Sequence, residues 1–160
     1  MKRKLYITKA HVAVEIISYV VMLVSFIFAI YAINTLPDEI PIHYDFYGNV
    51  DGYGSPGSII ILPIIMLICN LFISLMTHFV SPQFYNMPFK IKPGRELQAY
   101  KDVVWMLIGM ELMFSLFTLA SVWSQYISSG TIILIASVVL TVAIFAQIIV
   151  TLIVMYRHNK

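Results

Sequence analysis

Four long apolar stretches dominate the chain and limit the folds open to it. They cover about residues 12–34, 57–80, 103–125 and 130–156, and a helix needs about 20 apolar residues to cross the hydrocarbon core of a bilayer. Hydrophobic residues make up 60% of the sequence and charged residues 11%, whereas soluble domains carry about 25% charged residues. The sequence therefore predicts an all-α membrane protein with four transmembrane helices in a single domain, residues 1–160.

The basic residues are divided unevenly between the two sides of such a protein. All ten Lys and Arg lie before the first stretch, between the second and third, or after the fourth: Lys2, Arg3, Lys4, Lys9, Lys90, Lys92, Arg95, Lys101, Arg157 and Lys160. Short loops rich in Lys and Arg stay in the cytoplasm. We expect both termini to be cytoplasmic, the 35–57 loop to be extracellular, and the protein to lie in the plasma membrane. Because these residues record topology and form no groove, nucleic acid is not expected as a partner.

The 35–57 loop is the most elaborate polar segment of the sequence. It holds one His, four aromatic residues, no Lys or Arg, and four of the eight acids, which are Asp38, Glu39, Asp45 and Asp51. Pro37 should end the first helix near Leu36, and the stretch IPIHYDFYG favours extended structure or a hairpin. Ser55 and Pro56 are suited to cap and start the next helix. We therefore expect one structured extracellular loop between the first two helices.

Three chemical interpretations of this loop remain open. His43, Asp45 and Asp51 offer imidazole and carboxylate ligands for a metal ion, but their spacing matches no established signature, so a metal site stays unknown and these three are weak candidates. In the second interpretation the loop recognises an extracellular peptide or protein partner, with His43, Asp45, Gly48, Asp51 and Tyr53 as the binding residues. In the third, the loop is a folded cap without a ligand.

Each apolar stretch also carries a polar residue that we expect in the inner half of the bundle. These residues are Glu15, Asn70, Glu111 and Gln147. A buried acid is costly in a membrane unless it is paired or protonated, so Glu111 should face the interior and form a hydrogen bond with Gln147 or Asn70. The cluster then serves as interhelical hydrogen bonding, which we favour, or as a proton or ligand relay.

The loop sequence LPDEIPIHYDFYGNVDGYGS resembles the opening motif of the SdpI/YhfL-like family of bacterial membrane proteins, which carries a domain of unknown function numbered 1648. The shared positions are Leu36, Pro37, Ile40, Pro41, His43, Gly48, Asp51, Gly52, Tyr53, Gly54 and Ser55. The family's named member is an immunity protein against a secreted toxic peptide and is taken to signal by holding a repressor at the membrane. The resemblance implies a toxin-immunity or signalling protein, with an extracellular peptide toxin and a cytoplasmic repressor as partners.

Other function classes find less support in the sequence. It contains no H-E-x-x-H, no G-x-S-x-G and no Gly-rich phosphate loop, so we expect neither an enzyme nor a cofactor. Membrane lipid is an expected partner, and a homo-oligomer is left open because several copies would be needed to line a pathway. The alternatives are a small transporter or proton-coupled channel that uses Glu111, and a structural or accessory membrane role.

Overall fold

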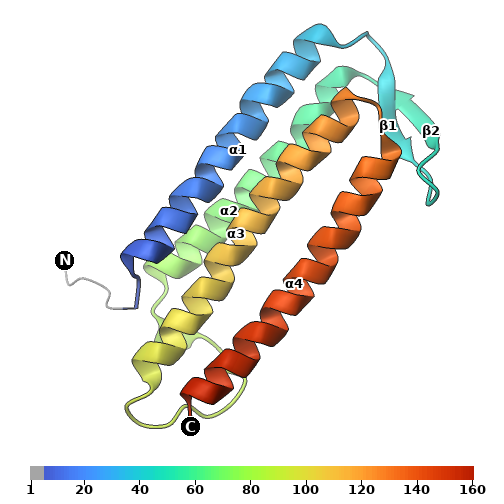
Figure 1. The fold of residues 1–160 in the computed structure, drawn as a ribbon. Helices are drawn as coiled ribbons and strands as arrows, with labels where there is room; N and C mark the ends of the chain where they lie inside the picture. The colour runs from blue at the N-terminus through green and yellow to red at the C-terminus, as the bar shows by residue number, and fades with distance from the viewer. Residues whose placement is uncertain (1–5) are drawn as a thin grey trace.

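The computed structural model describes residues 6–160 and is mostly helical (74%). In this part of the chain, four helices are long and apolar enough to cross a membrane, which confirms the expected four-helix membrane protein (Figure 1). They are α1 (Lys9–Thr35), α2 (Ile61–Phe79), α3 (Glu96–Tyr126) and α4 (Gly130–His158). The basic residues Lys2, Arg3 and Lys4, which the topology argument used, lie outside the described residues.

The prolines and capping residues set the helix ends as expected. Helix α1 stops at Thr35, and Leu36 becomes extended while its N–H still bonds the Ala32 carbonyl oxygen at 3.0 Å. The Ser55 hydroxyl accepts a hydrogen bond from the Gly57 N–H at 3.2 Å and so caps the short 3₁₀ turn η1 (Pro56–Ile60) that leads into α2. A second 3₁₀ turn, η2 (Pro82–Phe84), follows α2.

Helix α3 begins earlier than the apolar pattern indicated. The predicted span started at residue 103, whereas the helix starts at Glu96. Its first turns are polar, so they extend the helix beyond the apolar run that hydropathy detects. Glu96 also accepts a hydrogen bond from the Gly94 N–H at 2.8 Å, which fixes the chain just before the helix.

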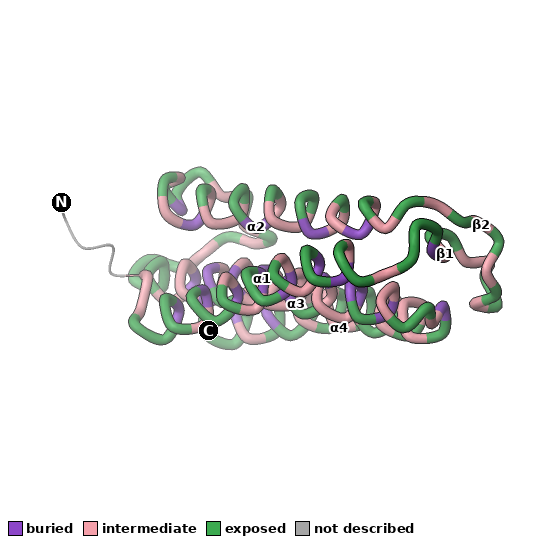
Figure 2. Tube along the Cα trace, turned by 90° about the horizontal axis from the view of Figure 1, so that it is seen from above, coloured by how far each residue is buried: buried purple, intermediate pink, exposed green. Residues whose placement is uncertain are grey.

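Helix α3 lies at the centre of the bundle and packs against each of the other three helices. Helices α1 and α3 run in the same direction, so His11 meets Trp105 at one end and Phe28 meets Trp123 at the other. The start of α1 and the end of α4 lie at one end of the bundle, and the loop between α1 and α2 lies at the opposite end (Figure 1). Burial is confined to narrow stripes along the helices (Figure 2), as expected for a bundle whose outer surface faces lipid.

The contact between α1 and α3 is a regular seam in which about half of the residues are small. Buried positions on α1 recur at alternating steps of four and three: His11, Glu15, Ser18, Met22, Ser25, Ala29 and Ala32. Positions of α3 follow the same steps from Val104 through Ile108, Glu111, Ser115 and Thr118 to Val122. This spacing is that of a coiled-coil seam, and small residues let membrane helices approach closely.

The expected loop structure is present as an antiparallel hairpin of β1 (Ile40–Tyr44) and β2 (Val50–Gly54). Ile40 holds the hairpin on the helices, because its side chain is buried in a cluster with Ala29 and Ala32 of α1, Ile59 of η1 and Val122 of α3. The hairpin is therefore part of the bundle's packing at this end of the molecule.

The tip of the hairpin rests on the start of α4 through two glycines. Gly48 has a φ of +85°, which favours glycine, and its carbonyl oxygen faces Gly130, the first residue of α4. A Cβ added at Gly130 would overlap that oxygen and the Tyr44 ring. The absence of a side chain at Gly130 is therefore what lets the hairpin tip touch the helix, whereas Gly48 is favoured by its backbone conformation.

We expect Gly130→Ala to destabilise the protein by about 1–3 kcal/mol, the usual cost of overpacking, although Ala favours helix more than Gly. Thermal unfolding of the purified protein in detergent measures the change. Gly57→Ala is the matched control, because a Cβ there meets only the Ser55 hydroxyl at 3.5 Å. Equal stability of the two variants would show that the hairpin tip does not need this close approach.

Candidate functional site

A single aspartate organises the hairpin tip. The Asp45 carboxylate accepts hydrogen bonds from the Tyr47 and Asn49 backbone N–H groups, each at 2.8 Å, and from the Asn49 amide at 3.0 Å. The Asp45 N–H donates to the Asn49 carbonyl oxygen at 2.8 Å, and the Gly48 N–H donates to that of Asp45 at 3.0 Å. The hydrogen bonds to the carboxylate lower the pKa of the Asp45 carboxyl, with the Asn49 side chain contributing most. Asp45 therefore holds the backbone of the turn in one conformation.

His43 and Asp51 form a separate pair on the two strands. His43 Nδ1 is bonded to Asp51 Oδ1, and His43 lies opposite Gly52 in the strand register. A Cβ at Gly52 would stand 3.0 Å from that of His43, so the glycine leaves room for the imidazole on this face. Both side chains are largely exposed, which leaves the pair accessible to a partner.

The hairpin also exposes aromatic side chains. Phe46 and Tyr47 at the tip are each 82% exposed, and Tyr53 on β2 is 61% exposed. The Phe46 and Tyr47 rings meet edge to face with their centroids 5.8 Å apart. We call Phe46, Tyr47 and Tyr53, together with the His43–Asp51 pair, the hairpin surface. Aromatic side chains on a fixed backbone are typical of protein-binding sites.

The five residues expected at this site thus have three different positions. His43, Asp51 and Tyr53 belong to the hairpin surface, whereas Asp45 is used by the turn and Gly48 by the contact with α4. Within residues 6–160 no group of three His, Cys, Asp or Glu side chains is arranged to hold a metal ion. The sequence interpretation passed over Phe46 and Tyr47 as binding residues. Their place at the tip of a two-stranded turn was the available signal, since side chains there have nothing to pack against.

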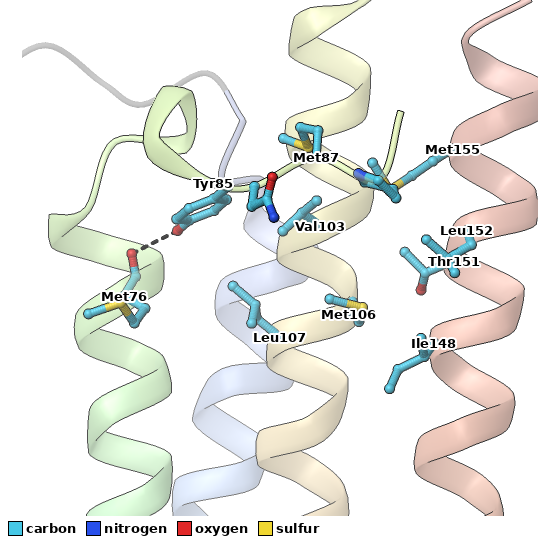
Figure 3. Close-up of a pocket in the computed structure, with 12 residues that line it drawn as sticks. Met76, Tyr85, Met87, Val103, Met106, Leu107, Ile148, Thr151, Leu152 and Met155 are labelled. Carbon is cyan, nitrogen blue, oxygen red and sulfur yellow. Dashed lines mark hydrogen bonds between the residues drawn. The ribbon is translucent and has the colours of Figure 1, made fainter. Parts of the chain in front are cut away.

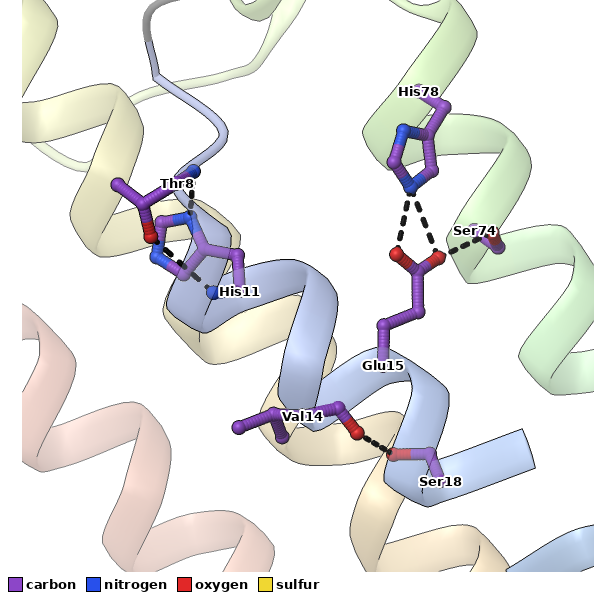
Figure 4. A network of polar contacts seen from close by, with 7 residues as sticks. All are labelled: Thr8, His11, Val14, Glu15, Ser18, Ser74 and His78. Atoms are coloured by element: carbon purple, nitrogen blue, oxygen red, sulfur yellow. Dashed lines mark hydrogen bonds and ion pairs between the residues drawn. The ribbon is translucent and has the colours of Figure 1, made fainter. Parts of the chain in front are cut away.

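A second polar site lies inside the bundle, where α1 faces α2 (Figure 4). His78 Nε2 lies 2.8 Å and 3.0 Å from the two Glu15 carboxylate oxygens, and the Ser74 hydroxyl donates to the same carboxylate at 2.7 Å. Ser74 and His78 are four residues apart on α2, so they share one face of the helix. That spacing was a signal for the pairing that the sequence interpretation did not use.

The remaining three residues of the expected intramembrane cluster do not converge on one point. Glu111 is fully buried, as expected, but among the described residues neither of its carboxylate oxygens has a hydrogen-bond partner. The Asn70 amide donates to the Glu111 backbone oxygen at 3.3 Å and to the Ser115 hydroxyl at 2.9 Å. The Gln147 amide donates to the Trp105 and Met106 carbonyl oxygens. The expected side-chain bond from Glu111 to Asn70 or Gln147 is therefore not formed.

Gln147 reaches those carbonyls because Gly109 leaves space for it. A Cβ at Gly109 would overlap the Gln147 amide, so this glycine lets the amide lie against the α3 backbone. The bonds made by Asn70 and Gln147 tie α2 and α4 to α3, which is the role of interhelical hydrogen bonds in membrane bundles.

The hydrogen bonds to Asp45 predict a pH dependence of the hairpin tip. Because the pKa of Asp45 is lower in the folded protein than its ordinary value of 3.8, its stabilisation is present above that value and is lost as the pH falls through the folded pKa. The amide chemical shifts of Tyr47 and Asn49, measured by NMR in detergent, should stay constant down to about pH 4 and change below it. Asp45→Asn should remove this transition. A transition that persists in Asp45→Asn would assign it to another group.

The comparisons with known proteins concern the end of the bundle that carries the hairpin. Residues 20–67 match the family model described as Domain of unknown function (DUF1648), and this segment runs from α1 through the hairpin into α2. No curated protein and no solved structure matches the chain significantly. The described chain thus has four helices that are long and apolar enough to cross a membrane, and the match to the DUF1648 model covers the later part of α1, the hairpin and the start of α2.

Proposed function

We propose that the protein lies in the plasma membrane with the hairpin outside and both ends of the chain in the cytoplasm. The described basic residues support this orientation, since Lys9, Lys101 and Arg157 lie in the ends of helices remote from the hairpin, and Lys90, Lys92 and Arg95 lie in the α2–α3 loop at the same end. Lys and Arg are retained on the cytoplasmic side during insertion. The segment around the hairpin, by contrast, contains acids and no Lys or Arg.

In this orientation the hairpin surface serves as a non-enzymatic binding site for an extracellular cationic, amphipathic peptide. Asp38, Glu39 and Asp51 give this end of the molecule a negative character that attracts cations. Phe46 and Tyr47 offer ring faces to Lys or Arg side chains and apolar area to the rest of a peptide. Binding of this kind would give the toxin immunity that the resemblance implies, and a cytoplasmic repressor at the opposite end rests on the resemblance alone.

The observation that carries this proposal is that the aromatic side chains at the hairpin tip are highly exposed while the backbone beneath them is held in one conformation. Phe46 and Tyr47 are the most exposed large hydrophobic residues in the described chain, at 82% each. The turn that carries them is nevertheless fixed by the hydrogen bonds of Asp45 and by the Gly48–Gly130 contact with α4. A binding surface that is already ordered loses little conformational entropy when the partner arrives.

The experiment compares tip variants in cells challenged with secreted cationic peptides. Expression of the protein should raise the peptide concentration that cells tolerate, and Phe46→Ala or Tyr47→Ala should each weaken peptide binding about 30-fold, the effect of losing a binding hot spot. Phe84→Ala is the matched control, because Phe84 is 75% exposed at the opposite end. Equal protection by all three variants would exclude the hairpin as the binding site.

Orientation is tested separately with a thiol introduced at the tip. In a background where Cys69 is replaced by Ser, Asn49→Cys should react with a membrane-impermeant thiol reagent in intact cells. Labelling only after lysis would place the hairpin inside and remove the basis for an extracellular partner.

The buried carboxylates favour a second function, in which the protein conducts protons across the membrane. Glu111 is buried without a hydrogen-bond partner among the described residues, and the Glu15–His78 pair lies on the neighbouring helices. Intramembrane acids and His residues arranged in this way are typical of proton pathways.

For this second function, proteoliposomes with an internal pH-sensitive dye should acidify when an inward proton gradient is applied, and Glu111→Gln should slow acidification at least about tenfold, as for other general acid–base groups. Its thermal unfolding should remain unchanged, because Gln keeps the size of the side chain. Ser137→Ala is the control, since the Ser137 hydroxyl donates to the Ile133 carbonyl oxygen of its own helix. A wild-type protein that conducts no protons would leave Glu111 with a structural role.

A further inference from the structure

The end of the bundle opposite the hairpin contains a pocket that neither the hairpin nor the buried carboxylates use. It has a volume of about 460 Å³, within the range of small-molecule sites, roughly 300–1,000 Å³. Its walls come from α2, α3 and α4, and the chain after α2 covers it (Figure 3). Met76, Met87, Met106 and Met155 line it from these four elements. Met side chains adapt to flexible apolar ligands, so the lining suits a hydrocarbon chain.

The segment that covers this pocket is fastened at both of its ends. The Tyr85 hydroxyl donates to the Met76 carbonyl oxygen of α2 at 2.8 Å. At the other end, Asn159, just after α4, accepts from the Lys92 N–H at 2.7 Å and donates to the Lys90 carbonyl oxygen at 3.0 Å. Residues 85–92 thus span from α2 to α4. The segment thus covers the pocket at the end of the bundle, and the side wall on α4 includes Leu152, which is also exposed on the outer face of the helix.

Positive charge is concentrated beside the same segment. Lys90 and Lys92 belong to it, and Arg157 and Lys160 lie at the end of α4 to which it is fastened; all four side chains are exposed. Lys92 Nζ lies 3.2 Å from the Lys160 backbone oxygen, which brings two of these residues together. Glu96 and Asp102 also lie at this end, where they bond the Gly94 N–H and His158, and the four basic side chains outnumber these two acids. The rim of the pocket therefore favours an anionic group.

We propose that this pocket binds an anionic phospholipid, with one acyl chain between α2 and α4 and the headgroup against Lys90, Lys92, Arg157 and Lys160. An apolar pocket between the helices and a basic rim at the membrane surface match the two parts of such a molecule. The lipid fills the space between two helices that each pack chiefly on α3, so it stabilises the position of α4. The inference does not depend on what the hairpin binds.

Native mass spectrometry of the detergent-purified protein tests the headgroup part. With dioleoyl phosphatidylglycerol and dioleoyl phosphatidylcholine added in turn, the protein should retain the anionic lipid preferentially. The double variant Lys90→Gln/Arg157→Gln should reduce this preference about 25-fold, since each basic residue near an anionic surface contributes a factor of about five. Lys101→Gln is the control, because Lys101 lies on α3 and belongs neither to the covering segment nor to the end of α4. Equal retention of both lipids would overturn the headgroup assignment.

Two neighbouring substitutions on α4 test the acyl-chain part. Thr151 is buried and lines the pocket, whereas Val150 beside it is 57% exposed. Thr151→Phe should abolish phosphatidylglycerol retention, and Val150→Phe should leave it unchanged.

A second pocket variant and a folding check test whether loss of lipid retention results only from misfolding. Met87→Trp fills the pocket from the covering segment without touching the helix contacts and should also abolish retention, with size-exclusion chromatography as the check on folding. Retention that survives in both pocket variants would overturn the proposal. A change of oligomeric state in these variants, with lipid retention intact, would assign the pocket to a second copy of the chain.

Discussion

Peptide groups in the hydrocarbon core of a bilayer have no water to bond, so each N–H and C=O there needs a partner within the protein. Continuous helices satisfy this condition through all four spans, and the extended backbone of the hairpin is confined to one end of the bundle (Figure 1). Hydroxyl groups on α1 follow the same rule, because Ser18 and Ser25 donate to the Val14 and Val21 carbonyl oxygens of their own helix. Because the hydroxyls of these small residues are hydrogen-bonded within α1, the helix can lie close against α3.

Once the backbone is satisfied, apolar burial no longer distinguishes one helix contact from another, because lipid is as apolar as the protein interior. Directional contacts take over this task. Asn70 ties α2 to α3, Gln147 ties α4 to α3, and the Glu15–His78 pair joins α1 to α2. Each contact fixes a rotation and a height of one helix relative to its neighbour. A few polar residues thus position α2 and α4, whose remaining surfaces are free to face lipid and, at one end, to enclose the pocket.

The elements that could be predicted from the sequence depend on local signals. The apolar runs gave the four spans, Pro37 gave the end of α1, and the turn-forming residues around Gly48 gave the hairpin. The start of α3 was misjudged, because the polar turn at Glu96 is helical without being apolar. Hydropathy detects the part of a helix that lies in lipid, and it misses polar turns that extend the same helix beyond the membrane.

The partners inside the bundle could be predicted only in part. Glu111, Asn70 and Gln147 were placed at similar depth, but depth does not give the rotation of a helix about its axis. Gln147 turned out to reach the α3 backbone through the space at Gly109. At the hairpin, the Asp45 carboxylate could in principle bind a metal ion or a partner, but its oxygens accept hydrogen bonds from residues of its own turn. The type of a residue shows which interactions its side chain can form, whereas the neighbouring groups in the folded protein determine which of them it does form.

The hairpin is packed on the helices, and this links the hairpin surface to the rest of the molecule. Ile40 is packed between α1 and α3, and Gly48 rests on Gly130 at the start of α4. A partner that displaced the hairpin tip would therefore have to shift α4 or open the Gly48–Gly130 contact. Helix α4 is held to α3 by Gln147 and, at the other end, by the His158–Asp102 pair. A displacement of α4 at the hairpin would therefore also strain these two contacts with α3.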